Sequence, residues 1–199
     1  MKTENKILMK QAREELAGKW GLAAVTFLVY LLITAGIQYI PILGPIAALI
    51  IGGPMTLGLI YFVLSISRKK EARLSQIFDG FENFGTALGA YLLVALFVFL
   101  WMLLLIIPGI IAAIAYSQTF FIIADNKKIS AMDAIRTSKK MMYGYKWKLF
   151  CLGLRFIGWI LLGILTLGIG LLWVYPYMFV SYAKFYDDIK GSAETEKSS

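Results

Sequence analysis

Charged residues are absent from three long blocks of this 199-residue chain. The blocks cover residues 20–67, 83–124 and 156–183, and the segments around them are rich in Lys and Arg. A bilayer excludes charge from its hydrocarbon core in this way, whereas a water-soluble domain shows no such pattern. We therefore expect an all-α protein that folds in a membrane, in agreement with a hydrophobic fraction of 59%.

The first two blocks are each long enough for two transmembrane helices, which need about 20 mainly apolar residues apiece. Prolines and glycines within residues 38–45 interrupt the first block, and Pro108-Gly109 interrupts the second. We predict spans near residues 20–39, 46–67, 85–107 and 110–124. The second of these contains Gly52-Gly53-Pro54, so a kink or a discontinuity is expected there.

The third block is shorter and leaves two alternatives open. Two spans, near residues 149–166 and 169–186, fit only if Arg155 and Lys184 extend to the lipid headgroups. Their turn would be the uncharged segment 166–170. The alternative is one helix from Phe156 to about Pro176, which would place the C-terminus on the opposite side of the membrane.

The loops between the blocks predict the orientation. Lys and Arg cluster before Trp20, at residues 68–73 and at residues 127–148, whereas the predicted turns carry none. Because basic loops stay in the cytoplasm, both termini are expected there in a six-span protein built from three hairpins. We expect a single integral membrane domain over residues 1–186 and a disordered polar tail over residues 187–199.

Each third of the chain repeats one order of elements: helix, Gly/Pro break, helix, polar segment. The polar segments 74–79 and 129–134 both have, at their second position, a serine that can cap a helix, Ser75 and Ser130. The match is short, so duplication and chance both stay open.

Two cytoplasmic segments have the pattern of amphipathic helices, residues 4–19 and residues 129–142. The second is surrounded by basic side chains, which suit the headgroups of anionic lipids. The alternative is a loop that only determines topology. The candidate headgroup contacts are Lys127, Lys128, Arg136, Lys139, Lys140, Lys146, Lys148 and, deeper in the bilayer, Arg155.

Polar and helix-breaking residues inside the spans are candidates for a small cavity or for hinges. Packing between helices is the alternative interpretation. The residues are Gly53, Pro54, Pro108, Ser117, Gln118, Thr119 and Pro176. Aromatic side chains surround Pro176 and are expected to anchor the last helix or, alternatively, to line a groove.

Catalytic chemistry has no recognisable motif in this sequence. Cys151 is the only cysteine and histidine is absent, which excludes an internal disulfide and an ordinary Cys/His zinc site. We predict no catalytic residue, no cofactor and no metal. The net charge of +8 lies beside apolar spans, which favours lipid over nucleic acid as its partner.

Several segments resemble a bacterial family of integral membrane proteins, domain-of-unknown-function family 975. They are residues 12–20, Gly53-Pro54, residues 75–81, residues 144–148, residues 156–159, residues 165–173 and Pro176-Tyr177. The resemblance implies a multi-helix bundle in the bacterial cytoplasmic membrane and assigns no site. The chain is also distantly similar to the membrane domain of some glycerophosphodiester phosphodiesterases, which implies lipid-related work.

Two functional hypotheses follow. The first is a non-enzymatic scaffold or accessory factor that engages anionic lipid through its basic cytoplasmic face, with membrane lipids, a second copy or another membrane protein as partners. The second is a transporter of small solutes or lipid, built from hairpins with broken helices. A membrane-embedded enzyme ranks third.

Overall fold

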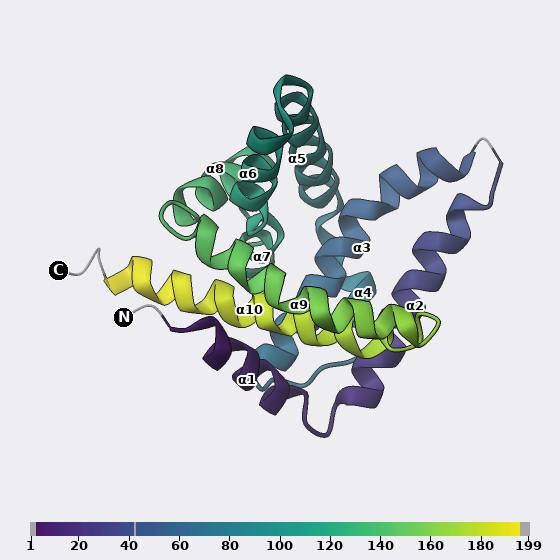
Figure 1. Ribbon diagram of the computed structural model, residues 1–199. Coiled ribbons are helices and arrows are strands. Elements are labelled where there is room, and N and C mark those ends of the chain that lie inside the picture. The colour runs from purple at the N-terminus through teal and green to yellow at the C-terminus, as the bar shows by residue number, and fades with distance from the viewer. Residues whose placement is uncertain (1–2, 42, 196–199) are drawn as a thin grey trace. The chain divides into compact units, whose positions relative to one another are not determined.

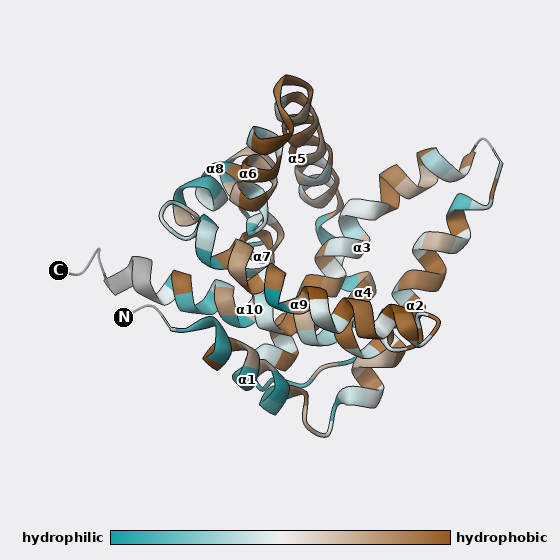
Figure 2. Ribbon diagram, in the orientation of Figure 1, coloured by the Kyte–Doolittle hydropathy of each residue, from teal (hydrophilic) through white to brown (hydrophobic). Residues whose placement is uncertain are grey.

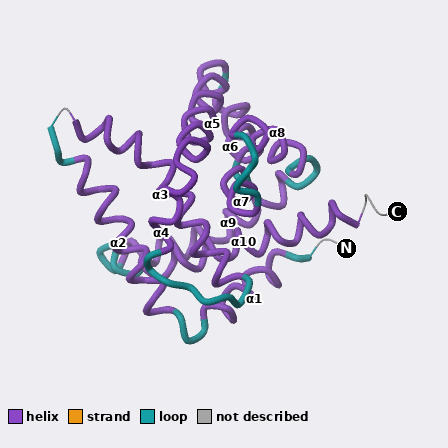
Figure 3. The backbone as a smooth tube through the Cα atoms, turned by 180° about the vertical axis from the view of Figure 1, so that it is seen from behind, coloured by secondary structure: helices purple, strands orange, loops and turns teal. Residues whose placement is uncertain are grey.

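The described chain is mostly helical and contains no strand in a computed structural model, of which residues 3–41 and 43–195 are described (Figures 1 and 3). The predicted all-α class is thereby confirmed. The helices are α1 (Asn5–Leu16), α2 (Trp20–Gln38), α3 (Leu43–Ser67), α4 (Gln76–Asp79), the 3-10 helix η1 (Gly80–Asn83), α5 (Phe84–Leu104), α6 (Ile106–Tyr116), α7 (Thr119–Asp125), α8 (Ala131–Met141), α9 (Lys146–Leu165) and α10 (Leu171–Thr195).

Five helical stretches among the described residues are long and apolar enough to cross a membrane, judged by length and composition. They are Trp20–Gln38, Leu43–Ser67, Gln76–Leu104, Ile106–Asp125 and Lys146–Leu165. Helix α10 is not one of them, because polar and charged residues such as Lys184, Asp187 and Asp188 occupy its second half. Figure 2 shows this change from apolar to hydrophilic residues along α10.

The chain divides into two compact units, each built from segments distant in sequence. Unit 1 comprises the described parts of residues 1–29, 62–74 and 147–199, and unit 2 comprises those of residues 30–61 and 75–146. No feature of the sequence pointed to this division. Helices α2 and α3 each contribute one portion to either unit.

Helices α5 and α6 of unit 2 pack antiparallel through a very tight reversal. Only Leu105 separates them, in an extended conformation, and Phe97 meets Tyr116 with ring centroids 6.1 Å apart. The predicted break lay three residues later, at Pro108-Gly109. Pro108 instead lies in the first turn of α6, where its missing N–H interrupts no helical hydrogen bond.

The predicted span 110–124 is not one continuous helix. Helix α6 ends at Tyr116 and α7 begins at Thr119, so Ser117 and Gln118 form a break between them. Helix α3, in contrast, is continuous through Pro54, and the discontinuity considered there is absent.

Close contact between backbones fixes the segment after α3 onto that helix. A Cβ atom added to Gly58 would lie 2.0 Å from the carbonyl oxygen of Ile77, and one added to Gly80 would lie equally close to that of Pro54. A Cβ atom added to Gly53 would lie 2.5 Å from the carbonyl oxygen of Ala87 on α5. Only glycine permits such distances.

Helices α9 and α10 of unit 1 form an antiparallel pair joined at residues 166–170, the segment expected to turn (Figure 1). The two helices contact each other through pairs of residues at increasing distance from the turn. A Cβ added to Gly163 would lie 3.1 Å from the backbone nitrogen of Leu171, and Phe156 meets Tyr177 with centroids 5.1 Å apart. Gly153 faces the Tyr182 hydroxyl.

The last helix extends further than expected. Residues 187–195 belong to α10 and are helical, although the sequence predicted a disordered tail over residues 187–199. Ion pairs made by Asp187 and Asp188 within unit 1 explain the difference. The remaining predicted tail, residues 196–199, lies outside the described residues.

Candidate functional site

Helix α8 carries most of the cations that the sequence singled out, and a serine defines its start. Ser130 accepts a hydrogen bond from the backbone N–H of Asp133 at 3.2 Å, as the N-cap prediction requires. Ser75, predicted to act in the same way, forms no side-chain cap and has helical backbone angles. The two polar segments therefore begin differently.

A second serine fixes α8 against the break between α6 and α7. The Ser138 hydroxyl donates to the carbonyl oxygen of Ala115 at 2.8 Å and accepts the backbone N–H of Gln118 at 3.2 Å. Ser138 and Gln118 are buried. Because a buried hydrogen bond can be satisfied only in one geometry, this contact sets which face of α8 is exposed.

The exposed face of α8 and the turn after it present a basic ridge, which we define as Arg136, Lys139, Lys140 and Tyr143. These side chains are exposed and together border an open hollow of 550 Å³. Arg136 also lies 3.7 Å from Asp133, one turn earlier on the same helix. Such an exposed pair is weak, so the guanidinium remains available to an external anion.

The other predicted headgroup contacts are dispersed. Lys127 pairs with Glu82 at 2.8 Å, and this hydrogen bond raises the pKa of the lysine. Lys128 is exposed, Lys146 is half-buried, and Arg155 is exposed on α9. Lys148 is held inside unit 1, where its ammonium lies 2.6 Å from Asp188 and is engaged in that pair.

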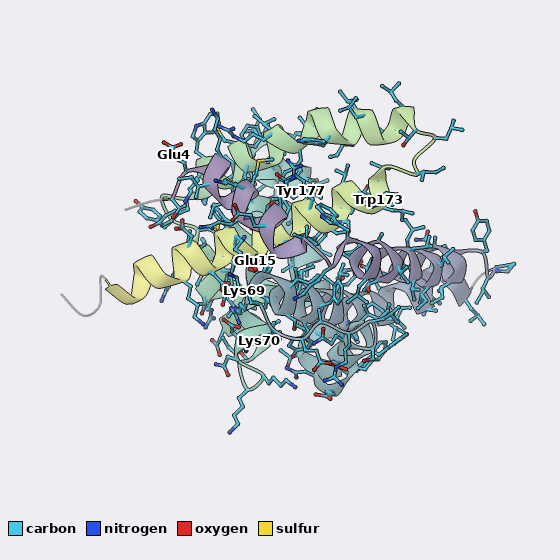
Figure 4. The ribbon with its side chains drawn as sticks, turned by 90° about the horizontal axis from the view of Figure 1, so that it is seen from below. Glu4, Glu15, Lys69, Lys70, Trp173 and Tyr177 are labelled. Atoms are coloured by element: carbon cyan, nitrogen blue, oxygen red, sulfur yellow. The ribbon has the colours of Figure 1, made fainter. Side chains whose placement is uncertain are left out.

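Unit 1 holds several partly buried ion pairs that connect α10 to other segments. Glu15 of α1 pairs with Lys184 at 3.2 Å and with Lys69 at 3.7 Å, and the Lys184 and Glu15 side chains are only 17% and 13% exposed. Arg68 pairs with Asp187 at 2.7 Å. Figure 4 shows Glu15 and Lys69 close together.

These pairs change the interpretation of Lys184. The two-span interpretation of the third block required its side chain to extend to the headgroups. Its ammonium instead contacts Glu15 and the carbonyl oxygen of Ser67. The sequence contained no signal for these partners, because they lie more than a hundred residues away along the chain.

The predicted cavity and hinge residues are mostly engaged in packing. Gly53 and Pro54 are buried at the close contacts of α3, Pro176 is buried within α10, and Pro108 opens α6. Ser117 and Thr119 donate hydrogen bonds to carbonyl oxygens one turn earlier. Gln118 differs, because its buried side-chain oxygen has no hydrogen-bond partner among the described residues.

An aromatic pocket of 370 Å³ lies within unit 1, close to the turn between α9 and α10. Its aromatic walls come from Trp20, Trp159, Trp173 and Tyr177, and Arg13 of α1 also lines it. Sequence reasoning noted the aromatic residues around Pro176 but did not connect them with Arg13 or Trp20. Figure 4 shows Trp173 and Tyr177 on α10, with Tyr177 nearer to α1.

Among the described residues, no group of three or more His, Cys, Asp or Glu side chains is placed so that it could hold a metal ion. The described residues form an all-helical fold, with five helical stretches that are long and apolar enough to cross a membrane.

A family described as a protein of unknown function, DUF975, matches residues 1–114 and 101–193, and the chain belongs to this family. Membership of this family of unknown function, expected from the sequence, is thereby confirmed. No curated protein and no solved structure matches the chain.

Proposed function

We propose that this chain is a non-enzymatic protein of the bacterial cytoplasmic membrane, acting as a scaffold or accessory factor that binds anionic lipid headgroups at the basic ridge. The observation that carries the proposal is the arrangement of α8. Ser138 fixes its buried face, while Arg136, Lys139 and Lys140 are directed outward as a preformed cationic surface. Each such cation near an anionic leaflet contributes about 1 kcal/mol to binding.

Two exposed aromatic residues, one after α8 and one at the start of α9, support a position at the membrane surface. Tyr143 of the ridge follows α8, and Trp147 lies in the first turn of the apolar helix α9; they are 84% and 73% exposed. Amphipathic aromatic rings gather at the level of the headgroups. A basic helix followed directly by these rings and by a span has the composition of a cytoplasmic interface.

The proposed topology has six spans in three hairpins with both termini in the cytoplasm. The antiparallel pairs α5–α6 and α9–α10 and the uncharged turns support it. The sixth span would be the apolar first half of α10, with Lys184 and the acids after it at the cytoplasmic surface. A reporter fused after Ser199 tests this topology: activity on the outer side would favour five spans.

Lipid binding is tested with the full chain purified in mild detergent. Titration with phosphatidylglycerol, followed by native mass spectrometry, compares the wild type with the triple variant R136Q/K139Q/K140Q. Three cations contribute about 3 kcal/mol, so we expect affinity to fall by up to about 100-fold. Phosphatidylcholine should bind both proteins equally.

The matched control is the triple variant K6Q/K10Q/K70Q, which removes the same charge from exposed lysines of unit 1. It should retain most of the affinity. Equal losses in both triple variants would show a response to net charge alone and would remove the ridge from the proposal.

The second candidate is a transporter, and one observation favours it. Gln118 lies at a break between two helices with a buried, unpartnered amide oxygen, the kind of polar group that broken helices present to a solute. A cysteine at position 118 in a Cys151→Ser background should then react with a water-soluble thiol reagent in membrane vesicles. A cysteine at position 118 that does not react with the reagent would count against a solute path at this break.

The distant similarity to the membrane domain of glycerophosphodiester phosphodiesterases remains a prediction. It agrees with lipid-related work and adds no residue to the proposed site.

A further inference from the structure

The aromatic pocket of unit 1 has rigid walls. Tyr177 stands at its centre, with ring centroids 6.3 Å from Trp20, 5.1 Å from Phe156 and 6.3 Å from Trp159. All three ring pairs are edge-on, at interplanar angles of 65°, 78° and 83°. Such edge-to-face contacts hold aromatic side chains in defined orientations, so the pocket is preformed.

The helix backbones close one end of the pocket. At Gly163 and Gly170, α9 and the start of α10 approach so closely that a Cβ on Gly170 would lie 3.0 Å from the Gly163 Cα. Thr166 fastens this end by donating to the Gly163 carbonyl oxygen and accepting the Gly170 N–H. Its hydroxyl is thereby satisfied and adds no free polar group to the lining.

The charge of the pocket is positive. Arg13 is exposed and forms no ion pair within the described part of the chain, while both acids beside it on α1 have other partners. Glu14 lies 3.9 Å from Lys10, and Glu15 pairs with Lys184. No carboxylate lines the pocket, so an anionic group would complement it.

The lining offers hydrogen-bond donors to a ligand. Trp20, Trp159 and Trp173 bring three indole N–H groups to the lining, and an indole can only donate a hydrogen bond. Together with the guanidinium they favour a ligand whose polar end accepts hydrogen bonds. The rest of the wall is apolar and suits a hydrocarbon chain.

We propose that this pocket binds a single-chain anionic amphiphile, with the carboxylate or phosphate headgroup at Arg13 beside Tyr177 and the hydrocarbon chain toward Trp173. Its volume of 370 Å³ is near the lower end of the roughly 300–1,000 Å³ of small-molecule sites, which favours one chain over two. Trp159 and Trp173 are each 47% exposed, so a chain can enter between them. The pocket shares no lining residue with the basic ridge.

The test uses the full chain in phosphatidylcholine nanodiscs with a diazirine analogue of palmitate. We expect saturable photolabelling within residues 159–177, displaced by palmitate or by lysophosphatidic acid but not by hexadecanol. Which of the two acids displaces the probe at lower concentration identifies the headgroup. Linear, unsaturable labelling, or displacement by hexadecanol, would overturn the proposal.

The charge is tested by Arg13→Gln, which should weaken binding of the probe about tenfold, because a hydrogen bond to a charged group is lost. Arg13→Lys should restore most of it. The matched control is Lys10→Gln, on the same helix but outside the pocket. Equal labelling of the Arg13→Gln and Lys10→Gln variants would reject the assignment of Arg13.

The aromatic wall is tested by Trp173→Ala against Trp147→Ala, an exposed tryptophan of unit 1 outside the pocket. Only the first should reduce saturable labelling. Circular dichroism monitors folding, and the Arg13 series keeps the proposal falsifiable if Trp173→Ala destabilises the chain. Intact phosphatidylglycerol binding by all these variants would separate this site from the ridge.

Discussion

The two units hold their polar segments in opposite ways. In unit 1, charges face one another: Glu15, Asp187 and Asp188 engage cations of other segments and are partly buried. In unit 2, glycine contacts and one serine attach the polar segments, and the cations of α8 remain exposed. The Lys and Arg side chains that are paired in unit 1 are therefore less available to an external ligand than the exposed cations of α8 in unit 2.

The largest effect is expected from the glycine contacts of unit 2. Gly58→Ala would place its Cβ 2.0 Å from a backbone oxygen, which cannot rotate away as a side chain can. We expect a loss of about 3 kcal/mol or more in the free energy of unfolding, measured by denaturation in detergent. Gly36→Ala is the control, because its Cβ would meet no atom within 4 Å. Equal stability of the two variants would show that α3 and the following segment are not in contact.

A smaller effect is expected from the ion pairs of unit 1. Glu15→Gln leaves the partly buried Lys184 ammonium without its carboxylate, at a cost of about 2 kcal/mol in the same measurement. Glu14→Gln, at the adjacent exposed position, should change stability by less than about 0.5 kcal/mol. Equal stability of the two variants would show that the partly buried ion pair of unit 1 stabilises the fold no more than an exposed pair does.

The smallest effect is expected at the exposed pair of Lys127 and Glu82 in unit 2. The carboxylate raises the lysine pKa above its ordinary value of 10.5. This contribution to stability is therefore fully present below about pH 10.5 and is lost as the pH rises through the raised pKa. Lys127→Gln should abolish it, so the stability difference between wild type and variant should shrink at high pH. A stability difference that stays constant as the pH rises would show that the ion pair of Lys127 and Glu82 does not contribute to stability.

The sequence was sufficient to predict the class of the protein and most of its helix positions. Exclusion of charge from residues 20–67 and 83–124 follows from the cost of burying a charge in an apolar medium, which acts on every residue independently. The Ser130 cap was predictable for a similar reason, because its hydrogen bond closes over three residues. Local rules failed at Ser75, which has helical backbone angles and forms no cap, and at Pro108, which lies within the first turn of α6.

Tertiary structure alone decided which charged groups remain available. Lys148 and Lys184 carry the same ammonium group as the lysines of the ridge, yet each meets a carboxylate from a distant segment. Arg13 and the tryptophans of the aromatic pocket likewise come from both ends of the chain. The sequence determined where charge is tolerated, because hydropathy is a property of single residues. Pairing depends on distances in space, and only the folded chain fixes them.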